Sequence, residues 1–254
     1  MPAPKQSREA AADSALAVVG AEDPSKPARA DTILDFPVRL TGNLNDAAYE
    51  QIRQALINGR LRPGQAFTIR ALGTAFGTSP MPVRDALKRL LAEGSLEMRR
   101  NRSVAVPVMS RKRFQEILQI RLQVEPDLAA RATSRITSAA IDAMSEDHHQ
   151  MCDAREAGDL LRHLSYNRAF HFRLYKAADT VMLLPLVETL WTQIGPHLRQ
   201  VFSEFPPRLA TPEHHHLAVV RALRRQDAAS AARAVYDDIA GAADALLAGE
   251  TFLM

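Results

Sequence analysis

The apolar positions between residues 44 and 110 recur every three or four residues in three short runs, a spacing that predicts three helices. A glycine follows each run, and glycine adopts the left-handed conformation of a helix end most easily. The three faces consist of Tyr49, Ile52 and Leu56, of Ile69, Leu72 and Phe76, and of Val83, Leu87, Leu90 and Leu91. Only residues 77–79 separate the second run from the third, and so short a turn predicts a helix-turn-helix unit.

The start of the third predicted helix is marked by its own residues. Ser79 suits the N-cap position, because its hydroxyl can accept a hydrogen bond from a first-turn amide. Pro80 and Pro82 are compatible with a first turn, where amides have no partner within the helix. Arg84 then lies about one turn into the helix, on the side away from its apolar face.

An alternating pattern follows the third helix and predicts a half-buried hairpin. The alternating residues are Leu96, Met98, Val104, Val106 and Val108. The loop between the two predicted strands contains three arginines, at positions 99, 100 and 102. A basic hairpin beside a helix-turn-helix predicts a wing that meets phosphate or a minor groove.

From residue 110 onward the apolar spacing is helical, and no stretch alternates as a strand would. The turn signals that interrupt it are residues 157–158, 179–180, 206–207 and 226–227. We expect a mainly α protein with an N-terminal winged helix-turn-helix and an all-α antiparallel bundle of about six helices. The predicted divisions are a flexible or leader-like tail over 1–40, a head over 41–110 and a bundle over 111–254.

Charge and composition narrow the class of protein. The chain of 254 residues carries a formal charge of +3, but residues 44–110 hold ten positive and five negative side chains. This concentration favours binding to a polyanion, although a merely solvated surface remains an alternative. The single cysteine excludes an internal disulfide framework, and the apolar run 181–187 is too short to cross a bilayer. The first residues do not resemble a secretory signal. We therefore expect a cytoplasmic protein without membrane contact.

Four polar residues occupy positions where helical spacing predicts core. Asn167 and His171 are four residues apart, His216 precedes an apolar face, and Asp238 lies on the apolar stripe of the last predicted helix. Two imidazoles and oxygen ligands aimed inward suit one divalent ion such as Zn, Ni or Mn. The alternative is a set of buried polar groups that satisfy one another.

The head resembles the DNA-binding domain of the GntR family of bacterial transcription regulators. The residues that carry the resemblance are the "RPG" after the first helix, "IRALGTAFGTS", "PVRDALKRLLAEG" and the basic wing. The resemblance implies contacts to double-stranded operator DNA from Arg70, Ser79, Pro80, Met81, Pro82, Arg84, Arg100, Asn101 and Arg102. Proline at position 80 cannot donate a hydrogen bond, so base reading is expected to depend mainly on Arg84. Its alternative role is an ion pair with Asp85 or Glu93.

The bundle resembles the FCD effector domain of the FadR subfamily of these regulators. The resemblance rests on "IRLQVEPDLAARAT", "NRAFHFRLYKAA", "TLWTQIGPHLRQVF" and "HLAVVRALRRQDAASAARAVYDDI". It implies metal ligands at Asn167, His171, His216 and Asp238, two of which depart from the family pattern of Asp at the first position and His at the last.

The same resemblance implies that Arg121 faces a small carboxylate effector, and a helical ion pair with Glu125 is the alternative. His197, like Trp191, is a candidate to line the same pocket, although either could belong to the core or an interface.

The expected function is ligand-responsive transcriptional regulation, most often repression in this family, by a homodimer that reads a two-fold DNA site. A metal-dependent enzyme is a weaker alternative, because the four-residue cluster has no separate general base and the chain has no nucleophile motif. An architectural DNA binder whose bundle only dimerises is a third interpretation. It would bind no small molecule in the bundle.

Overall fold

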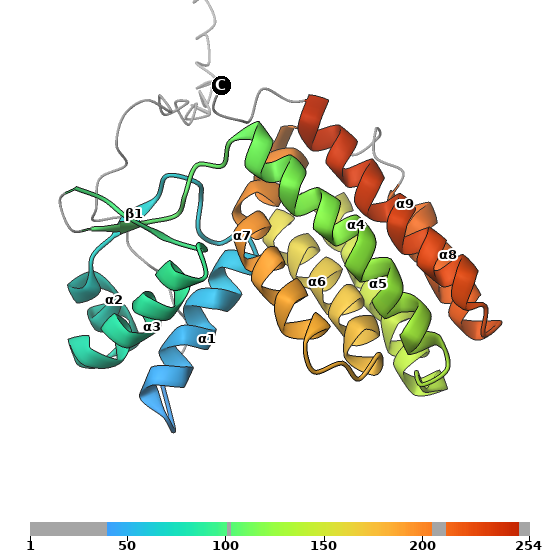
Figure 1. The fold of residues 1–254 in the computed structure, drawn as a ribbon, viewed down its shortest axis with the longest axis horizontal. Helices are drawn as coiled ribbons and strands as arrows, with labels where there is room; N and C mark the ends of the chain where they lie inside the picture. Colours follow the sequence, from blue (N-terminus) through green and yellow to red (C-terminus); the bar gives the residue numbers. More distant parts are fainter. Residues whose placement is uncertain (1–39, 101–102, 205–211, 249–254) are drawn as a thin grey trace, which may run out of the picture.

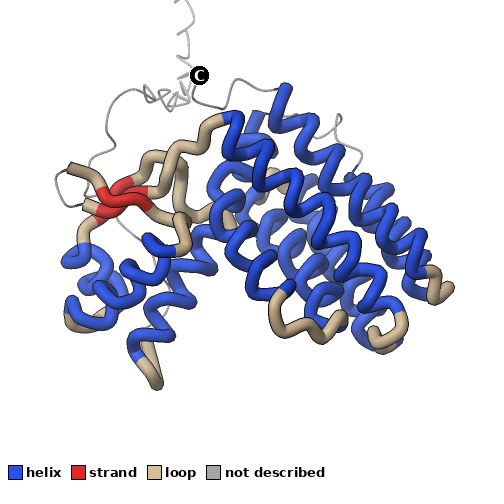
Figure 2. Tube along the Cα trace, in the orientation of Figure 1, coloured by secondary structure: helices blue, strands red, loops and turns tan. Residues whose placement is uncertain are grey.

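The computed structural model describes residues 40–100, 103–204 and 212–248. Over these residues a small head lies beside a larger layer of long helices (Figure 1). The strands are confined to the head, and every element of the larger part is a helix (Figure 2). The predicted mainly α fold is confirmed. The predicted tail lies outside the described residues except for its last residue.

The head contains the three predicted helices: α1 (Leu44–Ile57), α2 (Ile69–Phe76) and α3 (Pro80–Ala92). Thr68 caps α2 by accepting a hydrogen bond from the Ala71 amide, and Gly77 ends it with φ near 62°. The predicted apolar faces meet in one core, which is built around residues such as Ile52, Leu72 and Leu90.

The sheet of the head has three strands, β1 (Ala66–Phe67), β2 (Glu97–Met98) and β3 (Val104–Ala105), in the antiparallel order β1-β3-β2. The hairpin was predicted, but β1 was not, and the strict alternation is wrong. Val104, Ala105 and Val106 are all buried, because β3 is the central strand and is covered from both edges. Met98 lies on an edge strand and is 59% exposed.

Six helices follow in the described part of the bundle, and the elements pack side by side (Figure 1). They are α4 (Arg111–Thr133), α5 (Ser138–Glu156), α6 (Leu160–Ala177), α7 (Leu183–Glu204), α8 (Pro212–Arg224) and α9 (Ala228–Ala248). Three predicted turns are confirmed, with left-handed residues at Gly158, Asp179 and Gln226. The fourth, at 206–207, lies outside the described residues. Nothing tests the exact domain limits, which remain predictions.

The bundle core forms where α4 packs on α9, α5 on α6 and α8 on α9. Its largest fully buried side chains include Trp191, Tyr175 and Phe170. Across the described ranges, no helix combines the length and the apolar character that crossing a membrane would require.

The head joins the bundle through a backbone contact between the end of α1 and the middle of α7. A Cβ atom added to Gly195 would lie 2.6 Å from the Ile57 carbonyl oxygen, far inside van der Waals contact. On the facing segment, a Cβ at Gly59 would meet the Leu164 side chain at 2.9 Å. Ile57 itself belongs to the bundle core. The two parts therefore meet as backbone on backbone, with Pro196 following directly in α7.

Polar side chains reinforce this junction. Arg53 of α1 forms an ion pair with Glu188 of α7 at 2.9 Å. The other links run from bundle side chains to backbone carbonyls at helix ends of the head: Arg113 to Gly94 at 2.8 Å, Gln193 to Glu93 at 2.9 Å and Arg199 to Gly59 at 3.2 Å. Because carbonyls at helix ends have no partner within their own helix, these side chains satisfy them.

We predict that Gly195→Ala lowers the free energy of unfolding by about 1–3 kcal/mol, since the added methyl group must push α7 away from α1. Gly241→Ala is the matched control, because Gly241 lies in α9 with nothing within 4 Å of an added Cβ. The control should be neutral or stabilise by about 0.5–1 kcal/mol through helix propensity. Denaturant unfolding measures both variants, and equal midpoints for the two would contradict the close contact.

Candidate metal centre and nucleic-acid interface

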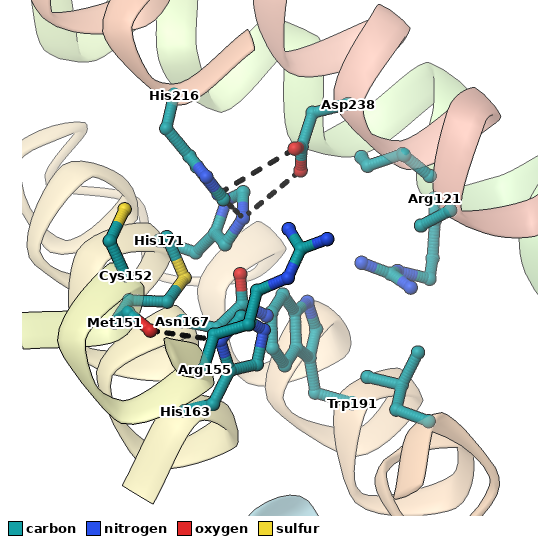
Figure 3. Close-up of a pocket in the computed structure, with 13 residues that line it drawn as sticks. Arg121, Met151, Cys152, Arg155, His163, Asn167, His171, Trp191, His216 and Asp238 are labelled. Atoms are coloured by element: carbon teal, nitrogen blue, oxygen red, sulfur yellow. Dashed lines mark hydrogen bonds and ion pairs between the residues drawn. The ribbon is translucent and has the colours of Figure 1, made fainter. Parts of the chain in front are cut away.

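Three of the four predicted inward-facing residues meet in the centre of the bundle. His171 comes from α6, His216 from α8 and Asp238 from α9 (Figure 3). Nε2 of His171 lies 3.2 Å from Nε2 of His216 and 3.2 Å from Oδ2 of Asp238. Nε2 of His216 lies 3.5 Å from Oδ1 of Asp238. The side chains are between 2% and 8% exposed, so the structure brings together three buried groups with lone pairs.

Apolar and aromatic neighbours hold the imidazoles in place. The Phe170 ring packs edge-on against His216 at 4.5 Å and against His171 at 5.4 Å between centroids. The Trp191 ring also packs against His171, with 5.3 Å between the two ring centroids. These contacts fix the rings, which is what a preorganised binding site requires.

Burial sets the charge state of the cluster. It lowers the pKa of His216 to about 3, so this imidazole is neutral at physiological pH. Burial alone would raise the pKa of Asp238, but the facing imidazoles of His216 and His171 lower it to about 2. A neutral imidazole and a carboxylate therefore face each other. Nδ1 of His216 is buried and has no hydrogen-bond partner among the described residues.

The donor set fits a divalent metal ion. Tetrahedral Zn²⁺ with bonds of about 2.0–2.1 Å places its ligand atoms about 3.3 Å apart. The two Nε2 atoms of His171 and His216 are 3.2 Å apart, which matches this edge length, and one ligand atom from each of the three residues lies within 4.8 Å of the other two. Two imidazoles and a carboxylate also leave coordination positions open for another ligand. Asn167 lines the same cavity one turn before His171, and its role as a ligand remains a prediction.

Arg121 is buried and paired with Glu125, which is the alternative that the helical spacing offered. Its guanidinium donates to both carboxylate oxygens, with Nη2 3.2 Å from Oε2. Burial would lower the pKa of Arg121, but the Glu125 carboxylate outweighs it and raises the pKa. The Arg121 side chain also lies over the Trp191 ring at 4.9 Å.

Glu125 accepts two further hydrogen bonds. The Tyr175 hydroxyl donates to Oε2 at 2.7 Å, and the Trp191 indole donates to the same oxygen at 3.1 Å. Burial, together with the neighbouring Glu125 carboxylate, raises the pKa of Tyr175 well above its ordinary value, so the phenol keeps its proton. The Tyr175 oxygen also lies 3.1 Å from Nδ1 of His171, which connects this group to the cluster.

A cavity of about 50 Å³ adjoins the cluster. Arg121 and Trp191 line it, as predicted, together with the cluster residues. Sequence reasoning missed its α5 wall, where Met151, Cys152 and Arg155 line it, and Figure 3 shows the Arg155 side chain reaching into the cavity. Helical spacing gives no sign of this, because Arg155 is partly exposed and looks like any surface arginine.

The expectation that His197 lines this pocket is wrong. His197 is 2% exposed and donates a hydrogen bond to the Pro107 carbonyl, in the segment between head and bundle. It does not belong to the cavity lining. His197 lies about one and two-thirds turns beyond Trp191 on α7, so its ring points toward the head and Trp191 toward the cavity.

The opposite end of the molecule presents the predicted nucleic-acid surface. Arg84 on α3, Arg70 on α2 and Arg100 on the wing are exposed. Within the described ranges, their guanidinium groups have no hydrogen-bond or ion-pair partner. The ion pairs considered for Arg84 do not form, because Asp85 pairs with Lys88 at 3.2 Å and Glu93 accepts from Tyr49 at 2.9 Å.

The start of α3 is partly as expected. Ser79 occupies the N-cap position and is exposed, but its side chain makes no capping hydrogen bond. Pro80 and Met81 are exposed, Met81 to 58%. Pro82 is buried in the head, unlike Pro80 and Met81, and its contact to DNA remains a prediction.

The wing is anchored by Arg99, whose Nη2 donates to the Gly64 carbonyl at 2.8 Å. Of the three loop arginines, Arg99 therefore has a structural contact, and Arg100 is exposed. Asn101 and Arg102, the other predicted wing-tip contacts, lie outside the described residues.

Two protein-family models match the chain. The model of bacterial regulatory proteins of the gntR family matches residues 44–106, and the model of the FCD domain matches residues 116–241. The first range coincides with the head and the second with the bundle that holds the cluster.

Curated relatives and solved structures agree with these matches. The chain is 28% identical to the HTH-type transcriptional regulator McbR of Escherichia coli over 69% of this chain and 80% of the relative. It is 25% identical to the HTH-type transcriptional repressor RspR of the same organism over 77% and 85%. The solved structure of E. coli McbR/YncC superposes with a TM-score of 0.77 at 24% identity, covering 82% of this chain and 98% of the other.

We predict that His197 makes stability depend on pH. Burial lowers its pKa from 6.5 to about 4, so the unfolded chain binds the proton first as the pH falls. The contribution of the neutral, buried His197 to stability is therefore present above pH 6.5 and is lost as the pH falls toward 4. We expect the free energy of unfolding to fall by about 2 kcal/mol between pH 7 and pH 5 through this group.

Denaturant unfolding at both pH values measures the effect. His197→Gln keeps a donor for the Pro107 carbonyl but does not titrate. Its loss of stability between pH 7 and pH 5 should be smaller by the same amount, and parallel losses in both proteins would refute the assignment.

Proposed function

Since the chain belongs to the gntR family of bacterial regulatory proteins and carries an FCD domain, we propose that it is a metal-assisted, effector-responsive repressor. It is a DNA-binding transcriptional regulator with an effector-binding domain. The observation that carries the finer proposal is the pairing of an exposed arginine surface on the head with a buried His₂Asp cluster in the bundle. We assign the cluster a regulatory role, because the relatives that the chain resembles are transcriptional regulators.

In this proposal α3 enters the major groove of operator DNA. Pro80 and Pro82 have no amide proton, so of the first three helical residues only Met81 can donate a backbone N–H to a phosphate. Ser79, Pro80 and Met81 are in contact with the DNA in this proposal. Arg84 reads a base edge, and a guanidinium pairs best with guanine. Arg70 and Arg100 contact phosphates on either side, and they contribute affinity instead of sequence preference.

In the bundle, His171, His216 and Asp238 would hold one divalent ion, with Zn, Ni and Mn as the candidates. A bound ion supplies a positive charge and open coordination positions for an anionic ligand. Asp238 keeps the net charge of the site lower than a third histidine would, and Asn167 offers a weak amide oxygen. We propose a small carboxylate as the effector, because it can bind the ion and a guanidinium at once.

The cavity is too small for a metabolite as it stands. A volume of about 50 Å³ holds a few water molecules at most, at about 10–15 Å³ for each. Effector binding must therefore widen the space between the bundle helices, which would shift the population between conformations with different head positions. Two heads of a homodimer would read a short palindrome, so their spacing decides the affinity for the operator.

We predict that Arg84→Ala costs about 1–3 kcal/mol in binding to the preferred duplex and relaxes the preference at one base pair. The preferred duplex is selected from random sequences with the full-length protein, and fluorescence anisotropy then measures both affinities. Arg131→Ala is the control, since Arg131 is an exposed arginine on the bundle. Wild-type affinity in the Arg84 variant would remove Arg84 from the proposed interface.

We predict that the purified protein binds about one equivalent of divalent metal and that His171→Ala with His216→Ala abolishes this binding. Elemental analysis after equilibration with Zn²⁺, Ni²⁺ or Mn²⁺ measures the content. His149→Ala is the control, because His149 is an exposed histidine of α5. If the double variant retains the metal, the cluster is not the site.

A further inference from the structure

A closed hydrogen-bond network connects Arg121 to the proposed metal cluster. Glu125 has no exposed surface, and its carboxylate accepts from Arg121 twice, from Tyr175 and from Trp191. Three of these four donors meet Oε2 and one meets Oε1, so both carboxylate oxygens have a donor within the protein. Arg121 is correspondingly enclosed, because both ends of its ion pair are buried.

The network determines which nitrogen of His171 carries a proton. The Tyr175 hydroxyl has a single proton, and the 2.7 Å contact gives this proton to Glu125. The Tyr175 oxygen then has only lone pairs left for the His171 Nδ1 atom at 3.1 Å. Two lone pairs at that distance repel each other, so Nδ1 must carry a proton and donate it to Tyr175.

A fixed proton on Nδ1 has a direct consequence for the other nitrogen. It leaves Nε2 as the position at which His171 can bind a metal. In the metal-free chain Nε2 lies 3.2 Å from both Nε2 of His216 and Oδ2 of Asp238, so by the same argument it donates a proton to Asp238, and a bound ion would take the place of that proton. The second histidine differs, because Nδ1 of His216 has no partner in the described parts of the chain. His171 is therefore the oriented ligand of the pair.

We propose that Arg121, Glu125 and Tyr175 are positioning residues that lock His171 for metal binding. This inference rests on the metal site of the proposed function. Partners of this kind hold the ring of a metal-ligating histidine in place and raise its affinity for the ion. Arg121 acts two hydrogen-bond partners away from His171, through Glu125 and Tyr175.

The first test is Tyr175→Phe, which removes the acceptor of the His171 proton together with one of the donors to Glu125. We expect the dissociation constant for Zn²⁺ to rise by about 10–100-fold, measured by competition with a chromophoric chelator. Tyr236→Phe is the matched control, because Tyr236 is 39% exposed on α9, and it should bind Zn²⁺ like the wild type. Circular dichroism of the metal-free variants verifies that they are folded. Unchanged Zn²⁺ affinity in folded Tyr175→Phe would overturn the proposal.

The second test observes the proton itself and does not require metal. Long-range ¹⁵N–¹H correlation spectra of the histidine rings should show a protonated Nδ1 of His171 in the metal-free and in the Zn²⁺-loaded full-length protein. In Tyr175→Phe the same N–H signal should exchange rapidly with water and disappear. An unprotonated Nδ1 in the wild type would also overturn the proposal.

Together, the two measurements distinguish a failure of the metal site from a failure of the positioning role of Tyr175. If the wild type binds no Zn²⁺ but its His171 Nδ1 is protonated and depends on Tyr175, the metal site fails and the positioning network stands. If the wild type binds Zn²⁺ equally well with and without the Tyr175 hydroxyl, the metal site stands and the positioning role fails.

Discussion

The bundle is organised around one fully buried carboxylate. Glu125 cannot reach water, so every lone pair of its side chain must find a donor within the protein, and the donors come from α4, α6 and α7. This requirement fixes the distance between three helices. It also places Trp191 and Tyr175 against the cavity wall. The cavity beside the cluster is thus shaped by the need to balance the charge of a carboxylate that has no contact with solvent.

Local signals along the chain predicted most of the helices and the wing hairpin, but not strand β1 of the sheet. The glycines at the helix ends and the prolines at the start of α3 act through their own backbone, so they can be recognised without tertiary structure. Strand β1 consists of Ala66 and Phe67 only, and two residues carry no period. The strand exists because β3 lies beside it, and that pairing joins segments almost forty residues apart.

The candidate site likewise combines features that local spacing predicts with features that depend on tertiary packing. Helical spacing identified His171, His216 and Asp238, because polar residues on an apolar stripe must be buried. It could not choose between an effector and Glu125 as the partner of Arg121, since both interpretations place Arg121 on the same face. Arg155 reaches the cavity and His197 does not, and neither fact follows from spacing, because each depends on how α5 and α7 are rotated against their neighbours.

The contact at Gly195 has a mechanical consequence. Pro196 has no amide proton, so the carbonyl of Thr192 loses its usual partner one turn earlier, and Gly195 adds no side chain to stiffen the helix. The most compliant point of α7 therefore lies where the helix presses on α1, between the cavity end at Trp191 and the head. A small change in the direction of α7 at this point would couple a movement of the cavity wall to a movement of α3 in the head.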